Sequence, residues 1–475
     1  MKNNKNKTMR HRFGSMLGMA VMAATLAGCT TAQDYSKPGI SVPPSWSFAD
    51  KKDRPKPPEL GEWWKSFNDP TLDSLIAKAI DGNLDVATAK SRIEEARASL
   101  RQTGAGEFPF SDASSSARRS KSSGGTVGIY QAGLDASWEI DLFGANKRAT
   151  EAARFGLNAA EEDLRATKLT LVGDIASNYV AARGYQAQQT LANKSAALQR
   201  ETLQITKNKE SLGAGTALDV ANAEGQTLST EANIPQLVAA YSETVNRLSV
   251  LTGEAPGALN KTMEKGRGRV PTARITKVKS GVPADVLSAR PDIRTAEYKL
   301  FQSKARKGAA EAARYPSVSL TGNISTSAAD FGDLAKSSTI AWAFGPSINV
   351  PIFNAGKVKA AAEVAKAQED QAFIAYRAAV LGALEDVENA SVSLTHERRR
   401  HAKLASSAGS YRRAAELSRT LYTEGASAFI DVLNAERSLY SSEDSLIQSR
   451  VALANDFIAL NKALGGGVVS KTSAR

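Results

Sequence analysis

The chain has 475 residues and a formal net charge of +12, and its residues are 42% apolar but only 6% aromatic. That length suffices for two or three globular domains or for one large elongated one. The charge does not indicate nucleic-acid binding, because five basic residues lie in the first 12 positions and no basic stretch interleaved with aromatic side chains follows. We therefore expect no nucleic-acid partner.

The N-terminal segment has the features of a secretory signal peptide: a cationic start, then a mainly apolar run over residues 13–27 that is too short to span a bilayer. The run ends in Leu26-Ala27-Gly28-Cys29, which resembles the lipobox of bacterial lipoproteins. This resemblance implies that residues 1–28 are removed and that Cys29 carries a covalent lipid; an ordinary buried thiol is the alternative. Cys29 is the only cysteine, so no internal disulfide is possible.

The residues after this cysteine predict a tether. Thr30 stands where, in the sorting rule of such lipoproteins, an aspartate would retain the protein at the inner membrane, so threonine implies the outer membrane. Proline recurs through residues 29–60, and proline-rich segments are extended. We expect a lipidated N-terminus and tether over this range that adds nothing to a core.

Four stretches of the sequence recur in the same order about 210 residues later, which indicates a tandem repeat. The longest match is ungapped and joins residues 213–224 to residues 425–436. The predicted domains are a first repeat over 61–252, an inter-repeat segment over 253–284, a second repeat over 285–465 and a C-terminal tail over 466–475.

Each repeat predicts a helical stretch, two strands, a very long helix, a glycine turn and another long helix. A helix of about 66 residues is roughly 100 Å long, more than a globular domain accommodates. Pro235 is expected to kink its helix. The helical stretches are 71–104 and 285–314, the strands 109–121, 126–141, 316–327 and 338–350, and the long helices 145–212, 216–252, 356–423 and 428–464.

The long helices show no broad apolar stripe, because alanine, serine, threonine, lysine and glutamate are mixed around them. A fibrous coiled coil would need a sustained leucine or isoleucine heptad, which is missing. A hollow cylinder, in which each helix packs on two neighbours through small residues, is the other interpretation.

The second strand of each repeat alternates between apolar residues and small or charged ones, over 130–141 and again over 339–350. Side chains on a strand point alternately to opposite faces, so one face is apolar and the other polar. A half-buried strand of a soluble sheet fits this pattern, but lengths of 10–14 residues also fit a tilted membrane-spanning strand. The stretch 111–121 is the weakest, because of Arg118 and Arg119. Four strands cannot close a membrane barrel and open edges are not tolerated in lipid, so several chains would have to contribute.

Together these features resemble the outer-membrane efflux protein family, of the TolC and OprM type, and more closely its lipoprotein (NodT-like) branch. The motifs that carry the resemblance are Trp63-Trp64 with Phe67 and Asp69-Pro70, Ala289 to Ile293, Pro351-Ile352-Phe353, Gly425 to Glu436, and Lys462 to Gly467. The resemblance implies an α+β membrane protein. It would be a homotrimer with a twelve-stranded β-barrel in the outer membrane, four strands per chain, continued by a long α-helical barrel in the periplasm.

The family also implies a gate where the long helices converge at the periplasmic tip. Asp431 matches an aspartate that forms a ring when three subunits meet, while Asn434 stands where the family has a second aspartate. Tyr422 matches a tyrosine that ties neighbouring helices, and Asp219 occupies the equivalent of Asp431 in the first repeat. The alternative for both aspartates is the first turn of a helix, where an acid complements the helix dipole; for Asp219 a capping box with Thr216 is equally plausible.

The same tip implies the partners. Family members meet a periplasmic adaptor there, which connects them to an inner-membrane pump, here of the resistance-nodulation-division type. The residues that correspond to the docking tip are Gly213, Gly215, Thr216, Gly425 and Ser427, the last of which replaces the family's arginine partner of the tyrosine. The turns themselves are sufficient to explain the glycines.

An enzyme is not expected. His396 and His401 are five residues apart and do not share a helical face, so they do not form a zinc site, and no nucleophile elbow or phosphate loop occurs. Glu424, Asp431 and Glu436 could be an acid and a base, but no substrate site accompanies them. We expect no cofactor apart from the lipid on Cys29, and an exit duct for small molecules as the function, with a structural coiled-coil lipoprotein of the cell envelope as the alternative.

Overall fold

The structure is a computed structural model that describes residues 35, 39–47, 61–272, 283, 286 and 289–466. It divides into two compact units. Unit 1 comprises residues 1–39, 92–161 and 295–377, and unit 2 comprises residues 40–91, 162–294 and 378–475. The predicted signal peptide and Cys29 lie outside the described residues. Within the described ranges, none of the helices combines the length and the apolar character that crossing a membrane requires.

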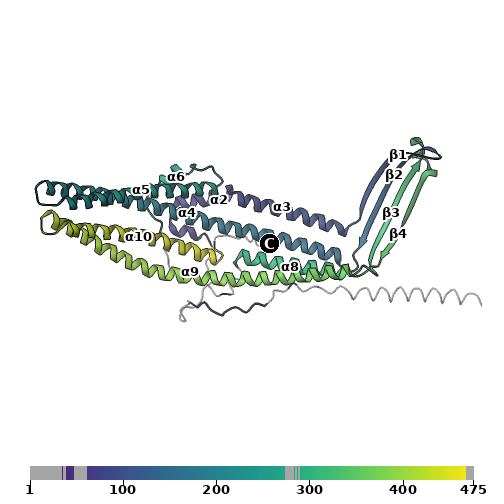
Figure 1. Ribbon diagram of the computed structural model, residues 1–475. Coiled ribbons are helices and arrows are strands. Elements are labelled where there is room, and N and C mark those ends of the chain that lie inside the picture. Colours follow the sequence, from purple (N-terminus) through teal and green to yellow (C-terminus); the bar gives the residue numbers. More distant parts are fainter. Residues whose placement is uncertain are drawn as a thin grey trace, which may run out of the picture. The chain divides into compact units, whose positions relative to one another are not determined.

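Unit 1 contains a four-stranded antiparallel sheet in the order β1-β2-β3-β4 (Figure 1). Each strand begins and ends within two residues of its predicted range. Two short 3-10 turns, η3 (Phe331–Asp333) and η4 (Ser337–Thr339), lie between the last two strands. The strands are β1 (Phe110–Ser122), β2 (Gly125–Ile140), β3 (Ser317–Ala328) and β4 (Ile340–Asn349).

The strand register gathers the apolar side chains on one face of the sheet. Leu134 lies opposite Ile324, and Ile324 lies opposite Trp342. Residues that face each other across strands project to the same side, so this row is apolar throughout. The three side chains are 47%, 47% and 76% exposed. The predicted apolar face is confirmed. In a soluble protein such a face would be packed against other elements, but the described part of this chain leaves it exposed.

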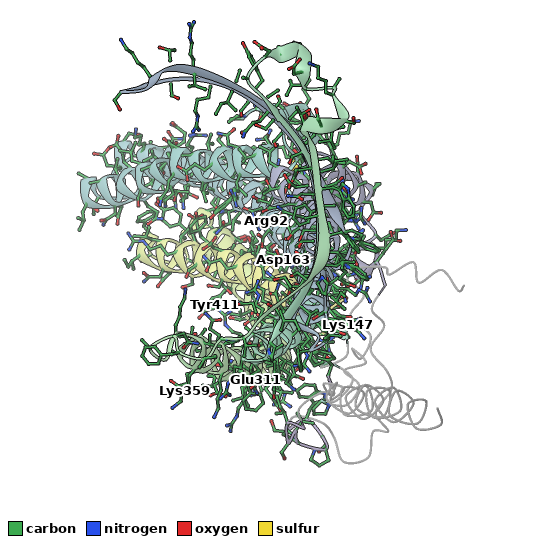
Figure 2. All side chains as sticks on the ribbon, turned by 90° about the vertical axis from the view of Figure 1, so that its right-hand side faces the viewer. Arg92, Lys147, Asp163, Glu311, Lys359 and Tyr411 are labelled. Carbon is green, nitrogen blue, oxygen red and sulfur yellow. The ribbon has the colours of Figure 1, made fainter. Side chains whose placement is uncertain are left out.

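Helices precede each pair of strands in unit 1. α3 (Leu84–Gly104) and the short η2 (Ala105–Glu107) lead into β1, and α8 (Pro291–Ala312) leads into β3. The strands then continue into the first turns of two long helices, α4 and α9. Charged side chains cover these helices, among them Arg92 of α3, Lys147 of α4, Glu311 of α8 and Lys359 of α9 (Figure 2).

Unit 2 is built mainly from four long helices, which form two hairpins (Figure 1). The bounds are within one residue of those predicted, because no strong helix breaker other than Pro235 interrupts the pattern. α5 continues through Pro235 without a break. The helices are α4 (Ala145–Ser211), α5 (Ala217–Leu251), α9 (Lys357–Thr423) and α10 (Phe429–Ala463).

The predicted helical stretch 71–104 consists of two helices. α2 (Pro70–Gly82) ends just before Asn83, and α3 starts just after it. The Asn83 side chain donates to the Leu251 carbonyl at 2.9 Å and accepts from the Val86 backbone N–H at 3.1 Å. Asparagine therefore caps a new helix and holds it against the end of α5, an interaction that the local sequence does not reveal.

The predicted tether also differs from expectation, because parts of it pack on both units. In unit 1, the Tyr35 hydroxyl donates to Glu151 at 2.7 Å. In unit 2, Trp46 is 5% exposed and belongs to the core, and the backbone and hydroxyl of Ser47 both donate to the Glu388 carboxylate. Burial of an aromatic side chain in this proline-rich stretch outweighs its preference for an extended, solvated chain.

A buried hydrogen-bond network in unit 2 surrounds Arg183 of α4, which is 1% exposed. Its guanidinium donates to the Tyr179 hydroxyl at 3.0 and 3.1 Å and to the Met263 carbonyl at 2.9 Å. Met263 belongs to α6 (Asn260–Glu264) in the inter-repeat segment. Tyr179 donates to Asp69 at 2.6 Å, and burial together with this bond raises the pKa of Tyr179 to about 12. Asp69 also caps α2, so the network joins three segments distant in sequence.

Two of the motifs quoted for the family resemblance have structural roles in the same unit. The tryptophan pair belongs to η1 (Trp63–Phe67), where the Trp63 indole donates to the Gly466 carbonyl at 3.2 Å. Arg290 donates to Asp292 at 2.7 and 3.0 Å, to Asp386 at 3.0 Å and to the Ala463 carbonyl at 3.0 Å. Both motifs therefore hold the end of α10 in place.

Candidate functional site

The two hairpins of unit 2 end in closely similar turns. At each turn a glycine has the left-handed conformation that ends a helix, with φ of 74° at Gly213 and 80° at Gly425. The next residue donates back to the helix, from Ala214 to the Lys209 carbonyl at 2.8 Å and from Ala426 to the Leu421 carbonyl at 2.7 Å. The glycines are thus required by the backbone, and the repeat is preserved at the level of individual hydrogen bonds.

The helix that follows the first turn begins with a complete capping box. The Thr216 hydroxyl accepts from the Asp219 backbone N–H at 3.1 Å, and the Asp219 carboxylate accepts from the Thr216 backbone N–H at 3.2 Å and from its hydroxyl at 2.7 Å. The Asp219 carboxylate is therefore engaged within its own helix end. This is the alternative role that its spacing from Thr216 predicts.

The second tip lacks this cap. Ala428 stands at the position that corresponds to Thr216, and a methyl side chain offers no hydrogen bond. The Asp431 side chain is exposed and forms no hydrogen bond or ion pair with the described residues. Asn434 is exposed as well, and a spacing of three residues places it on the same side of α10. With alanine in place of the capping threonine, the Asp431 carboxylate is left without a partner in the first turn of α10.

Tyr422 lies at the centre of a small buried cluster between the two hairpins. The side chain is 6% exposed and packs on Phe429 with a centroid distance of 5.8 Å. Its hydroxyl donates to the Thr206 hydroxyl of α4 at 3.2 Å. The Lys209 ammonium, also on α4, lies 4.2 Å from the ring centroid and donates to the Tyr422 carbonyl. Tyr422 thus ties α9 to α4, and Thr206 and Lys209 are its partners.

Glu436 is also near the tip, but it is buried and neutralised. It is 8% exposed and accepts from the Arg419 guanidinium at 2.6 Å and from the Thr202 hydroxyl at 3.1 Å. Glu424 is exposed at the turn itself. Glu436 is therefore held in a buried ion pair, whereas Glu424 and Asp431 are exposed.

The structure brings together only part of the predicted set. Asp431 and Asn434 share a surface, Tyr422 lies beneath it, and Asp219 belongs to the other tip. The Ser427 hydroxyl oxygen is buried and has no hydrogen-bond partner among the described residues, so it does not replace the family's arginine. Sequence reasoning missed Thr206 and Lys209, whose spacing of three on α4 carries no signal without the neighbouring helix.

The tips also expose apolar side chains. Leu212 and Leu218, on either side of the first turn, are 82% and 69% exposed, and Ile430 of the second tip is 50% exposed. Gly213 and Gly425 are exposed beside them.

Comparison with known proteins gives consistent matches over nearly the whole chain. The family model described as outer membrane efflux protein matches residues 75–254 and 282–466. Nodulation protein T of Rhizobium leguminosarum bv. trifolii is 34% identical over 448 residues, with 93% of this chain and 95% of the relative covered. The cation efflux system protein CusC of Escherichia coli O6:H1 is 31% identical, with 94% and 97% covered.

The solved structures agree. The outer-membrane channel OprN superimposes with a TM-score of 0.84 at 32% identity, and the match covers 92% of this chain and 99% of that one. The four strands and the four long helices lie within the residues that the family model matches. The chain therefore belongs to the outer membrane efflux protein family.

Proposed function

We propose that this protein is the exit duct of a tripartite efflux system. The observation that carries the proposal is the sheet of unit 1, which exposes an apolar face and ends in two edge strands, β1 and β4. Unpaired strand edges are not tolerated in a bilayer, and four strands are too few to close a barrel. Three copies would pair their edges into a barrel of about twelve strands, and the long helices would continue the duct into the periplasm.

The gate is proposed to lie at the second helix tip, on the surface shared by Asp431 and Asn434. Three Asp431 carboxylates near one axis would repel each other and attract cations, while asparagine at the second position halves the charge that the ring could carry. Tyr422 would hold each tip closed through Thr206 and Lys209. Asp219 would act through its capping box, by fixing the start of α5 beside the gate.

The partners follow from the same arrangement. The tip glycines Gly213, Gly215 and Gly425, with Thr216 and Ser427, are proposed to dock on a periplasmic adaptor, which connects the duct to an inner-membrane pump of the resistance-nodulation-division type. A lipid on Cys29 would anchor the protein in the outer membrane. The cargo is proposed to be small molecules that the pump selects.

Conductance across a planar lipid bilayer tests the proposal. The purified full chain should produce discrete current steps, whereas a structural coiled-coil lipoprotein would produce none. Cation block then tests the gate. Asp431→Ala should weaken block by divalent cations added on the periplasmic side, because it removes the free carboxylate.

The matched control is Asp219→Ala, which makes the same chemical change at the equivalent position of the first repeat. It should weaken cation block much less than Asp431→Ala does, because that carboxylate is engaged in the capping box and its loss reaches the gate only through the start of α5. Equal effects of the two substitutions, or no effect of either, would refute the gate at Asp431 without touching the duct itself.

A further inference from the structure

The apolar face of the sheet has a measurable height, and aromatic side chains lie at one of its ends. Cross-strand rows from Ile140 to Tyr130 of β2 span ten residues, which is about 33 Å along a strand and about 25 Å in height for a strand tilted by about 40°. That height matches the apolar band of a membrane barrel. At the upper limit of this band, the Tyr130 and Phe331 rings form an edge-on pair 5.8 Å apart.

Two cations follow this aromatic pair on the same face. Ala117 of β1 lies opposite Tyr130, so the odd-numbered residues of β1 share the apolar face, including Arg119 and Lys121. They lie about 7 and 13 Å beyond the aromatic pair along the strand. Tyr130 is also the last β2 residue paired with β3, so the hairpin continues past the sheet at this point.

Neither cation is neutralised within the described part of the chain. Arg119 and Lys121 are exposed and form no ion pair with the described residues. Arg119 lies opposite Gly128, and Lys121 opposite Thr126, so no bulky side chain from β2 covers them. Nitrogen-tipped side chains stand away from the free end of this hairpin in Figure 2. Long cationic side chains just outside an apolar band and an aromatic belt are placed at the level of lipid headgroups.

We propose that Arg119 and Lys121 bind the phosphate groups of an anionic lipid in the outer leaflet. This inference rests on the proposed function, because it takes the apolar face to be the lipid-facing one. Two cations two residues apart on one face present a charge pair of the kind that attracts phosphate, and guanidinium can bind it through two parallel hydrogen bonds. The site would hold a lipid at the seam where β1 pairs with a neighbouring copy.

Arg118 provides a matched control within the same strand. It is also exposed, but it lies opposite Ile129 and projects to the other face. Arg119→Ser and Arg118→Ser remove the same charge from adjacent positions, and serine already recurs along β1, so the strand should tolerate either change. The two arginines differ only in the face of the sheet to which their side chains project.

The experiment measures binding of lipid A to the full chain in a neutral detergent by native mass spectrometry. The probes are lipid A, the same lipid after phosphatase treatment, and inorganic phosphate as a competitor. Arg119→Ser and Lys121→Ser should each weaken lipid A binding about fivefold, as expected from about 1 kcal/mol per basic residue near an anionic lipid surface. Arg118→Ser should not, and the dephosphorylated lipid should bind all variants equally weakly.

Equal losses for Arg118→Ser and Arg119→Ser would overturn the proposal, because the attraction would then be a general charge effect. Full competition by inorganic phosphate at the concentration of the lipid would also overturn it, in favour of a free-anion site. The conductance of the same preparations distinguishes failure of the lipid site from failure of the proposed duct. A chain that conducts but fails these tests contradicts the lipid site alone, whereas a chain that never conducts contradicts the duct.

Discussion

The contact between α4 and α9 at the second tip predicts how strongly each of its members holds the proposed gate closed. Two bonds join Tyr422 to α4. One is the neutral hydrogen bond from its hydroxyl to Thr206, which at 3.2 Å is long for a bond between oxygens. The other involves the Lys209 ammonium, which donates to the Tyr422 carbonyl and lies 4.2 Å from the ring centroid.

The magnitudes of the two bonds differ. A long neutral bond contributes about 1 kcal/mol or less, whereas a bond from a charged donor contributes about 1.5–3 kcal/mol and the cation–π contact about 0.5–1 kcal/mol more. Because Lys209 is only half-buried, we take about 2 kcal/mol for it. Every 1.4 kcal/mol is a factor of ten, so Tyr422→Phe should shift the opening equilibrium of one tip about fivefold and Lys209→Met about thirtyfold.

Single-channel recording in planar bilayers measures this difference as open probability. In the proposed trimer the shifts would multiply if the three tips open together. The open probability of Tyr422→Phe should therefore be clearly higher than that of the unchanged protein, and the open probability of Lys209→Met should approach its maximum. Lys207→Met is the control, because Lys207 is an exposed lysine on the same helix with no partner among the described residues. A larger effect of Tyr422→Phe than of Lys209→Met would refute the reasoning, as would an effect of Lys207→Met.

Three further predictions concern stability and the cap. Arg290→Lys should lower the melting temperature of the helical circular-dichroism signal, at a cost of about 2 kcal/mol, because lysine cannot reproduce the forked bonds to Asp292; Arg314→Lys, at an exposed arginine, should not. Burial and the nearby Arg450 lower the pKa of His401. Below about pH 6.5 the unfolded chain therefore binds the proton more readily than the folded chain, and the stability falls as the pH drops. His401→Gln should reduce this loss of stability in melting curves taken below about pH 6.5 and should change nothing above that pH. Ala428→Thr should complete a second capping box, which would slow amide hydrogen exchange in the first turn of α10 and weaken cation block by engaging Asp431.

Elements whose signals are local could be predicted from the sequence. The long helices lack breakers and end at glycine turns, and the strands alternate with a period of two, so their bounds came within two residues of the structure. The capping box of Thr216 and Asp219 is equally local, since both partners lie within one turn.

Interactions between distant segments could not be predicted in this way. The break at Asn83 depends on the Leu251 carbonyl, and the burial of Trp46 depends on a core assembled from several helices. The partners of Tyr422 belong to a helix more than two hundred residues away in sequence. Periodicity shows that a residue is on a helix, but it does not show which neighbouring helix meets it.

The two helix tips share the same turn but differ in how the following helix is capped. The glycine turn has the same backbone conformation and hydrogen bonds in both copies, and these bonds satisfy carbonyl groups at the helix ends, which constrains the backbone there. The side chains at the helix start are under no such constraint. The first copy retains threonine and uses its aspartate to stabilise α5, whereas the second has Ala428, gives up that stabilisation and leaves Asp431 free. Alanine at the N-cap of α10 forgoes about 1 kcal/mol of capping. Such a loss in one copy only agrees with the proposed gate, in which Asp431 serves an ion or a neighbouring subunit rather than the fold.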